Sequence, residues 1–265
     1  MPFVSKPISP IFMHKRNTQQ RRRAIIDTLT ARGEVTVEAL AQQFATSEVT
    51  IRKDLAALEA SGLLLRRYGG AVPVPQELMN DGGAGRISER KQALAQAAAE
   101  LIGDHNRIII DSGTTTAALL PELSSRQGLV VMTNSLHIAN ALRELENEPT
   151  LLMTGGTWDP RSEGFQGQLA EQVLRSYNFD QLFIGADGLD LTRGTTTFNE
   201  LYSLSQVMAE VAREVVVMAE SEKLGRKIHN LELPWSAVGV LVTDQDFPDS
   251  ATEALEQQGV KVIRA

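Results

Sequence analysis

The chain is 265 residues long, with 42% hydrophobic and 22% charged residues, no cysteine and four histidines. This length favours two domains, and the composition is that of a globular protein without a membrane span. The absence of cysteine excludes disulfides and cysteine nucleophiles, and the scattered histidines form no HExxH pair, so we expect neither a metal site nor a cofactor.

The charge is divided unevenly along the chain. Residues 1–75 carry eleven lysine and arginine residues against six acidic residues, a net charge of +5, which leaves −12 for the remainder of a chain whose total is −7. A basic segment joined to an acidic one is typical of proteins in which one domain contacts the phosphate backbone of nucleic acid. The sequence therefore predicts a DNA-binding domain near its beginning.

Residues 1–13 contain three prolines and show no hydrophobic periodicity. They also lack the continuous apolar stretch of a signal peptide. We interpret them as a disordered extension and expect the protein to be cytoplasmic, a location that the absence of cysteine also suits.

Residues 14–72 show three short helical patterns followed by a hairpin pattern. The first covers residues 18–32, the second follows Thr36 as its N-cap, and the third follows Ser47 after a three-residue turn. Residues 63–72 hold two short runs around a glycine pair, which predicts a β-hairpin. This order of elements predicts a winged helix-turn-helix domain.

The third helical pattern has the two faces that a helix in the DNA major groove needs. At 100° per residue, Val49 and Lys53 point away from the apolar stripe through Ile51. Alone, such charged residues are more typical of a solvated face, but the turn, the hairpin and the charge division favour DNA contact. The residues that we expect to contact DNA are Ser47, Val49, Thr50, Arg52 and Lys53 on the helix and Arg66, Arg67 and Tyr68 on the hairpin.

The arginine run of the first helix is less specific. Arg21, Arg22 and Arg23 are consistent with contact to DNA phosphates, but also with the solvated start of a helix. Both interpretations stay open at this point.

A motif joins the third helix to the hairpin. Ser-Glu-Val-Thr-Ile-Arg-Lys-Asp-Leu at 47–55 is followed by Leu58-Glu59 and by Arg-Tyr-Gly-Gly-Ala at 67–71. This combination resembles the N-terminal signature of the deoxyribose-operon-regulator (DeoR) family of bacterial repressors, and implies operator DNA as a partner. The family usually has arginine in place of Lys53 and often histidine in place of Tyr68; lysine keeps the positive charge but not the bidentate fork.

A linker and a second domain follow. Residues 73–86 are rich in proline and glycine, which predicts a linker, and residues 87–265 alternate apolar runs with amphipathic stretches such as 136–145 and 168–177. This alternation predicts a parallel α/β sheet. The runs that we expect to be strands are 107–110, 129–132, 150–153, 181–184, 214–218, 238–242 and 260–263.

Polar loops follow these expected strands. The loop at 111–116, Asp-Ser-Gly-Thr-Thr-Thr, offers hydroxyl and N–H groups to an anion at the start of a helix. Each loop alone is more typical of a helix cap or tight turn, but six loops at the carboxyl ends of parallel strands favour one shared ligand pocket. The other five loops are 133–135, 154–156, 185–188, 195–200 and 221–223.

The same loops resemble the effector domain of the DeoR family, which is related in fold to ribose-5-phosphate isomerase. The resemblance implies a Rossmann-like, phosphosugar-isomerase-like α/β sensor domain that binds a sugar phosphate. It places the phosphate at 112–116 and 134–135, and the sugar hydroxyls among Asp187, Glu200 and Lys223. The full set of expected effector-binding residues is Asp111, Ser112, Gly113, Thr114, Thr115, Thr116, Asn134, Ser135, Gly155, Gly156, Asp187, Thr197, Glu200 and Lys223.

Two details refine this resemblance. The family commonly has Asp-Ser-Ser-Lys where this chain has Glu-Ser-Glu-Lys at 220–223, so the contacts of that loop differ while Lys223 is kept. Residues 167–171 and 197–200 look most like those of repressors of hexitol and amino-sugar operons. A sugar-operon repressor released by a phosphorylated sugar is the function that the resemblance implies.

An enzyme is the main alternative. A phosphosugar isomerase needs a carboxylate base and a lysine around the open-chain sugar, and Asp187, Glu200 and Lys223 are candidates. The related isomerases, however, carry a lysine-glycine loop where this chain has Gly-Thr-Thr-Thr at 194–197, and neither nucleotide motif GxxxxGK[ST] nor GxGxxG occurs. We therefore expect no enzyme activity and no catalytic residue. A DNA binder without a ligand is a third possibility, which leaves the polar loops unexplained.

The sequence also bears on assembly. One recognition helix per subunit reads one operator half-site, so that a symmetric operator requires at least two subunits. We expect a homo-oligomer, a dimer or a tetramer.

Overall fold

The computed structural model describes residues 10–59, 63–67, 69–73, 87–160, 162–199, 203–226 and 228–265. The chain divides into two compact units, residues 1–85 and 86–265, each with its own hydrophobic core. Most of the expected linker, 74–86, lies outside the described residues.

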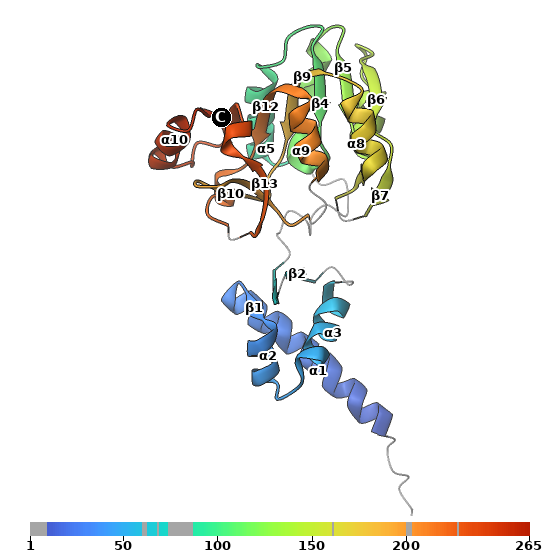
Figure 1. The fold of residues 1–265 in the computed structure, drawn as a ribbon, viewed down its shortest axis with the longest axis vertical. Coiled ribbons are helices and arrows are strands. Elements are labelled where there is room, and N and C mark those ends of the chain that lie inside the picture. The colour runs from blue at the N-terminus through green and yellow to red at the C-terminus, as the bar shows by residue number, and fades with distance from the viewer. Residues whose placement is uncertain are drawn as a thin grey trace, which may run out of the picture. The chain divides into compact units, whose positions relative to one another are not determined.

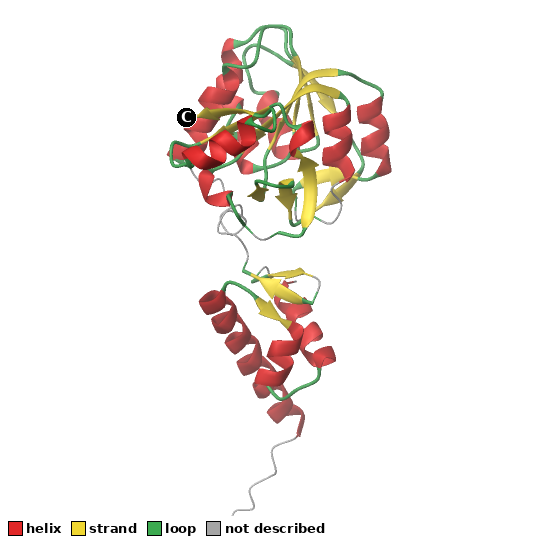
Figure 2. Ribbon diagram, turned by 60° about the vertical axis from the view of Figure 1, so that its left-hand side comes forward, coloured by secondary structure: helices red, strands yellow, loops and turns green. Residues whose placement is uncertain are grey.

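The first unit is a winged helix-turn-helix. Helix α2 begins at the expected cap, because the Thr36 hydroxyl accepts the N–H of Ala39 at 3.2 Å, and Ser47 similarly accepts the N–H of Thr50 at 3.3 Å ahead of α3. Figure 2 shows the short strands in yellow beside the helices. The elements are α1 Pro10–Arg32, β1 Val35–Thr36, α2 Val37–Gln43, α3 Glu48–Glu59, β2 Leu65–Arg67 and β3 Gly70–Val72.

The start of α1 corrects one expectation. Residues 10–13, which we assigned to a disordered extension, belong to α1, whose expected start was near Thr18. Proline is favoured in the first turn of a helix, because the N–H that it lacks would have no partner there. The following residues are mostly polar, so no apolar periodicity marked the helix. Residues 1–9 lie outside the described residues.

Strand β1 adds a third strand to the predicted hairpin. The sheet order is β1-β3-β2, and both pairings are antiparallel. Gly70 of β3 is required at this crossing, since a Cβ there would lie 2.1 Å from the carbonyl oxygen of Val35. The two-residue strand was missed because it is too short to show alternation.

The second unit is built on a seven-stranded sheet in which every pairing is parallel. All seven expected strands are confirmed, with ends shifted by at most a few residues. The strand order is β15-β14-β12-β9-β4-β5-β6, which is the Rossmann-like arrangement that we expected. The bounds are β4 Arg107–Ile110, β5 Val130–Thr133, β6 Thr150–Met153, β9 Phe179–Ile184, β12 Ala212–Met218, β14 Val240–Thr243 and β15 Lys261–Arg264.

Helices cover both faces of this sheet. Leu182 faces the core beneath α8, α9 and α10, whereas its neighbour Phe183 faces the core beneath α5 and α7. Figure 1 shows α8 and α9 together over one face. Burial on both faces explains why the strands are continuous apolar runs. The helices are α5 Glu89–Ala99, α6 Thr114–Ala117, α7 Leu136–Leu142, α8 Gln168–Arg175, α9 Ser203–Glu210 and α10 Asp249–Glu256, with 3-10 turns η1 Leu120–Ser125, η2 Ser221–Lys223 and η3 Trp235–Ala237.

Two small antiparallel sheets, which we did not expect, complete the second unit. Strands β7 (Thr157–Asp159) and β8 (Gly164–Gln166) form a hairpin, and β10 (Gly188–Asp190), β11 (Gly194–Thr197) and β13 (Asn230–Pro234) form a sheet in the order β10-β11-β13. Short polar strands of this kind carry little apolar periodicity. None of the described helices combines the length and apolar character needed to cross a membrane.

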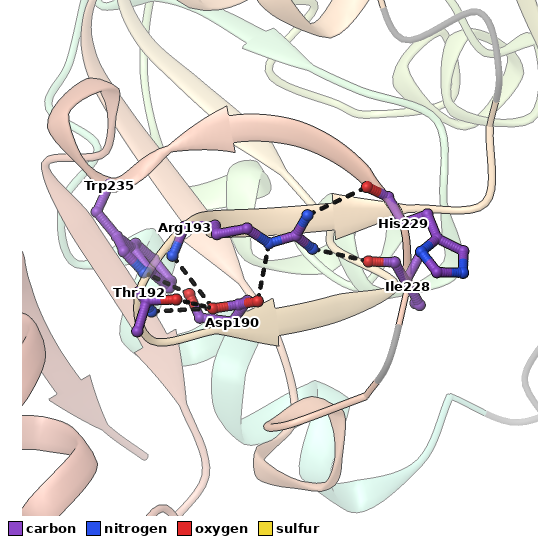
Figure 3. Close-up of polar contacts among 6 residues, drawn as sticks. All are labelled: Asp190, Thr192, Arg193, Ile228, His229 and Trp235. Carbon is purple, nitrogen blue, oxygen red and sulfur yellow. Dashed lines mark hydrogen bonds and ion pairs between the residues drawn. The ribbon is translucent and has the colours of Figure 1, made fainter.

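An arginine fixes the turn between β10 and β11 (Figure 3). Arg193 binds the carboxylate of Asp190 at 2.9 Å and donates to the backbone oxygens of Ile228 at 2.8 Å and His229 at 3.2 Å. Hydrogen bonds from Thr192 and Arg193 lower the pKa of Asp190 to about 2. The indole of Trp235 donates to the Asp190 backbone oxygen at 2.8 Å. These bonds tie the turn to the residues on either side of β13.

Candidate functional site

Helix α3 presents the two faces that its sequence predicts. Ile51, Leu55 and Leu58 are buried in the core of the first unit, while Val49 is 58% exposed and Lys53 is exposed. A valine this exposed can bury its methyl groups against thymine methyl groups in the major groove. DNA contact by these residues stays a prediction, but their outward orientation is observed.

The arginines expected at DNA are paired with glutamates in the free protein. Arg52 binds Glu48 at 2.7 Å within α3, and Arg66 lies 3.6 Å from Glu59. Arg67 binds Glu34. Exposed pairs such as Arg52–Glu48 contribute about 0–1 kcal/mol and are screened by salt, so a phosphate can take the place of the glutamate.

Two other expected DNA contacts are less available. The hydroxyls of Ser47 and Thr50 lie 2.9 Å apart in a mutual hydrogen bond at the start of α3. Tyr68 lies outside the described residues.

The arginine run of α1 divides into different roles. The Nε–H groups of Arg21 and Arg22 donate to the two carboxylate oxygens of Asp54, at 2.6 and 2.9 Å, whereas Arg23 is exposed. Arg21 and Arg22 are therefore held against α3, whereas Arg23 lies on the exposed side of α1. Sequence reasoning missed Asp54, although an acidic residue between the core positions Ile51 and Leu55 was a signal of a buried pair.

In the second unit, several of the expected effector residues lie in loops at a topological switch point of the sheet. From β4 the chain proceeds outward through β5 and β6, then returns to pair β9 with the other side of β4 and proceeds outward through β12, β14 and β15. A crevice opens at such a point beyond the carboxyl ends of the two strands, and it is where open α/β sheets bind ligands. The loops at 111–116 and 185–188 follow these two strands.

Asp111, Ser112 and Asn134 are joined in one hydrogen-bonded group. The Asn134 amide accepts the Ser112 N–H at 2.9 Å and donates to the Asp111 carboxylate at 2.9 Å. The β7–β8 hairpin packs against this group, because Phe165 donates its N–H to the backbone oxygen of Asn134 at 2.8 Å. Gly164 contacts it so closely that a Cβ would lie 2.9 Å from the Ser112 hydroxyl. Three sequence-distant loops thus meet here.

The threonine loop is more internally bonded than expected. The Thr116 hydroxyl donates to the backbone oxygens of Asp111 and Gly113 at 2.8 and 2.9 Å, and the Lys91 ammonium donates to the Thr114 hydroxyl at 2.6 Å. Helix α6 has only four residues, so its dipole supplies little to an anion. Lys91 brings a positive charge to this loop, which sequence reasoning missed.

Asp187 organises the loop after β11. Its carboxylate accepts the Thr197 hydroxyl at 2.9 Å and the Phe198 N–H at 3.0 Å. Arg226 donates to the Asp187 backbone oxygen at 3.3 Å. Lys223 is buried at the end of β12, in the 3-10 turn η2. Glu200 lies outside the described residues.

The remaining expected residues shape the backbone. The Ser135 hydroxyl caps α7 by accepting the Ile138 N–H at 3.4 Å. Gly155 and Gly156 have positive φ, and a Cβ on Gly156 would lie 2.5 Å from the Gln166 backbone oxygen. These glycines allow β6 to lead directly into the β7–β8 hairpin.

Glu232 is a buried carboxyl that sequence reasoning missed. It lies on β13, where Ser205 and Thr195 donate their hydroxyls to it at 2.9 and 3.4 Å. Burial, with smaller contributions from the charges of Asp187 and Asp111, raises the pKa of Glu232 to about 8. Burial likewise raises the pKa of Asp111 to about 6. The signal in the sequence was a single acidic residue between two leucines in a strand.

The polar groups of Asp111, Ser112 and Asn134 are of the kind that bind hydroxylated ligands. Carboxylates and an amide accept and donate hydrogen bonds in the manner that sugar hydroxyls require, and buried polar groups make such recognition selective. Among the described residues, no group of three or more histidine or acidic side chains is placed to hold a metal ion.

Each of the two units matches a known protein family. The DeoR-like helix-turn-helix domain matches residues 21–77, and the DeoR C-terminal sensor domain matches residues 86–245. Together these two families account for most of the chain.

Two curated relatives extend over nearly the whole chain. A protein of Escherichia coli O157:H7 named "Putative aga operon transcriptional repressor" is 38% identical over 93% of this chain and 93% of its own length. The HTH-type transcriptional regulator GlpR of Haloferax volcanii is 33% identical over 92% of this chain and 96% of its own length. Among solved structures, a ribose 5-phosphate isomerase A from Methanocaldococcus jannaschii aligns with 52% of this chain and 54% of that chain, at 21% identity and a TM-score of 0.39.

Proposed function

This chain belongs to the DeoR family of transcriptional regulators, and we propose that it represses a sugar-utilisation operon and leaves its operator when a phosphorylated sugar binds the second unit. Its relatives are named as transcriptional regulators, so the chain is a DNA-binding regulator and not an enzyme. The proposal concerns the effector, the sugar class and the release.

The observation that carries the effector proposal is the convergence of polar groups at the switch point between β4 and β9. Asp111, Ser112 and Asn134 form one bonded group there, and Asp111 is close enough to Asp187 for their charges to interact. A polyhydroxylated ligand can add hydrogen bonds to carboxylate, hydroxyl and amide groups of this kind, whereas an apolar ligand cannot.

Positive charge near this group favours a phosphorylated sugar over a neutral one. Lys91 reaches the Thr114 hydroxyl, and Lys223 is buried at the end of the neighbouring β12. A phosphate takes hydrogen bonds from ammonium, hydroxyl and backbone N–H groups together. We assign the phosphate to the loop at 112–116 with residues 134–135, and the sugar hydroxyls to Asp187, Glu200 and Lys223.

The sugar class rests on resemblance. Residues 167–171 and 197–200 look like those of hexitol and amino-sugar operon repressors, and one relative is named for the aga operon. We propose a hexitol or an amino sugar as the substrate of the regulated operon.

A thermal-shift screen against hexitol, hexose and amino-sugar phosphates tests the proposal. Tryptophan fluorescence reports on the second unit alone, because Trp158 and Trp235 are the only tryptophans in the chain. A binding sugar phosphate at a hundredfold excess over its Kd stabilises the unit by about 2.7 kcal/mol. The unphosphorylated sugars and inorganic phosphate are the controls. Equal stabilisation by the unphosphorylated sugar would contradict the phosphate assignment, and no shift with any of the phosphates would contradict the effector proposal.

Recognition of a two-fold operator also predicts an oligomer. We propose a dimer or tetramer, since one α3 helix per subunit reads one half of a two-fold operator. Light scattering of the full chain tests this, and a monomer at micromolar concentration would contradict it.

A further inference from the structure

A buried acidic residue lies on the helix that carries the expected DNA-reading side chains. Asp54 of α3 is 2% exposed and directly follows the exposed Lys53. It lies on the side of α3 that faces α1, beside the core residues Ile51 and Leu55. Fully buried aspartates are rare unless they are paired, so this residue has a specific structural reason to be there.

Its partners are two adjacent arginines on α1. The Nε–H of Arg21 donates to one carboxylate oxygen of Asp54 at 2.6 Å, and that of Arg22 donates to the other at 2.9 Å. The arginine side chains are 14% and 36% exposed, against 3% for Asp54. Each carboxylate oxygen therefore has its own directional bond to the same neighbouring helix.

These bonds constrain α3 in a way that its apolar contacts do not. Ile25 and Leu29 of α1 pack against Ile51 and Leu55 in one core, and such contacts depend on area more than on angle. Charged hydrogen bonds weaken steeply when they are misaligned. A buried ionic group is weak evidence for stability, and its best-attested role is to fix the register of packed helices.

The rotation of α3 about its own axis determines which of its side chains face the DNA bases. Neighbouring residues on a helix differ by 100°, so a rotation of a fraction of that angle moves Lys53 and Val49 away from the base edges they would read. Direct base readout depends on such placement, whereas phosphate contact by flexible arginines does not.

We propose that Asp54 is a positioning residue for DNA recognition: by binding Arg21 and Arg22 it sets the rotation of α3 on α1, and through it the sequence specificity of Lys53 and Val49. The inference rests on DNA binding through α3, which the proposed function includes. It also divides the arginine run, because Arg21 and Arg22 bind Asp54 while the exposed Arg23 is left for phosphate.

The test compares two duplexes with the full-length chain. Selection from a randomised duplex library by the wild-type protein supplies a preferred sequence, and a scrambled duplex of the same composition is the reference. Binding of both is measured for Asp54→Asn, with Asp27→Asn as the matched control. Asp27 is exposed on α1, so its substitution makes the same change in charge. Measurements are made where circular dichroism shows each variant folded.

The expected result is a selective loss. Asp54→Asn lowers the ratio of preferred to scrambled affinity by about tenfold or more, and its affinity for the scrambled duplex matches that of Asp27→Asn. Asp27→Asn itself changes the ratio by less than roughly twofold. Arg22→Lys keeps the charge but loses the Nε–H bond, and it lowers the ratio while folding in full. Arg23→Ala weakens both duplexes equally.

Two outcomes overturn the inference. A purely structural Asp54 would leave the ratio unchanged in folded Asp54→Asn and Arg22→Lys, and would change only their thermal stability. Equal weakening of both duplexes by Arg22→Lys with its fold intact would make Arg22 a phosphate contact. If the wild-type protein enriched no sequence at all, the DNA-binding part of the proposed function would fail instead.

Discussion

Two buried carboxyls of the second unit have pKa values that shift in the same direction for the same reason. Burial raises the pKa of Asp111 to about 6 and that of Glu232 to about 8. The folded protein therefore holds protons that the unfolded chain releases above its ordinary carboxyl pKa values of 3.8 and 4.5. The free energy of unfolding therefore falls as the pH rises from 3.8 to about 6 through Asp111, and from 4.5 to about 8 through Glu232. Above about pH 6, only Glu232 of these two residues still lowers it.

Replacement of Glu232 isolates its contribution. Glu232→Gln keeps hydrogen-bonding capacity toward Ser205 and Thr195 but cannot ionise. We expect the Tm of the wild-type second unit, followed by tryptophan fluorescence, to fall as pH rises from 6 to 9, and that of Glu232→Gln to fall less. Glu210→Gln on the surface of α9 is the control and should follow the wild type. Parallel curves for all three proteins would show that Glu232 is ionised in the fold.

Lys53 and Arg52 are adjacent, but their geometry assigns them different contacts. Lys53 lies on the outward axis of α3, whereas Arg52 lies at its flank and binds Glu48. We expect Lys53→Ala to cost about 1–3 kcal/mol on the preferred duplex and to relax its specificity. Arg52→Ala should weaken preferred and scrambled duplexes alike and reduce the salt dependence. Unchanged discrimination by Lys53→Ala in a binding titration would remove it as a base reader.

At the level of single residues, the sequence showed which side chains point outward but not which polar groups pair. The exposed face of α3 followed from the 3.6-residue period. The Asp54 pairs could not be predicted, because they join residues more than thirty positions apart across a helix packing whose angle the sequence does not specify. Glu232 was missed for the same reason, as its hydroxyl partners come from other elements.

Among elements, the β7–β8 hairpin packs directly against the candidate effector site. Gly164 of β8 has an ordinary backbone conformation, so alanine is allowed there, but its Cβ would lie 2.9 Å from the Ser112 hydroxyl and 3.1 Å from the Asn134 amide. We expect Gly164→Ala to weaken effector binding at least tenfold by displacing these groups, with DNA affinity in the absence of effector unchanged.

Calorimetric titration with the sugar phosphate found in the thermal-shift screen provides the measurement. Gly103→Ala, whose Cβ would approach only the Asn106 side chain at 3.4 Å, is the matched control. Undiminished effector binding by Gly164→Ala would place the ligand away from the hairpin.

The strands that are buried on both faces could be predicted from the sequence, whereas the polar strands could not. The seven parallel strands have apolar side chains on both faces, so continuous apolar runs located all of them. Strand β11 was missed, because Gly-Thr-Thr-Thr at 194–197 is polar in sequence. Its threonines are nevertheless buried, through pairing with β10 and β13 that is set by tertiary contacts. Antiparallel additions of this kind depend on context more than on local pattern.

For the whole molecule, the division of charge predicts that DNA binding belongs to the first unit. A fragment of residues 10–85, which includes all of α1, should bind duplex DNA alone. The logarithm of its binding constant should fall linearly with the logarithm of the salt concentration, with a slope of about −0.9 for each phosphate contact. Fluorescence anisotropy from 50 to 200 mM salt measures this slope. Binding by residues 86–265 and not by 10–85 would reverse the assignment of the two units.

The proposed release of DNA by an effector would link the two units thermodynamically. A sugar phosphate that lowers DNA affinity tenfold must itself bind the DNA complex tenfold more weakly, a coupling of about 1.4 kcal/mol. Thr115 and Lys223 are both buried beside the candidate effector site. We expect Thr115→Val and Lys223→Ala to lose the effector response and to keep DNA affinity in its absence, so that cells with either variant show constitutive repression.

Reciprocal titration separates loss of the ligand from loss of the coupling. DNA affinity is measured with and without the sugar phosphate, and sugar phosphate affinity with and without DNA. Both variants should bind the ligand weakly, because each loses a polar group from the site. A variant that binds the ligand normally but keeps its DNA would instead have lost the coupling. Normal release by both variants would place the effector at another site, and aldose–ketose interconversion by the wild type would contradict a purely regulatory role. Because the coupling is an equilibrium quantity, the two titrations must give the same factor in the wild-type protein.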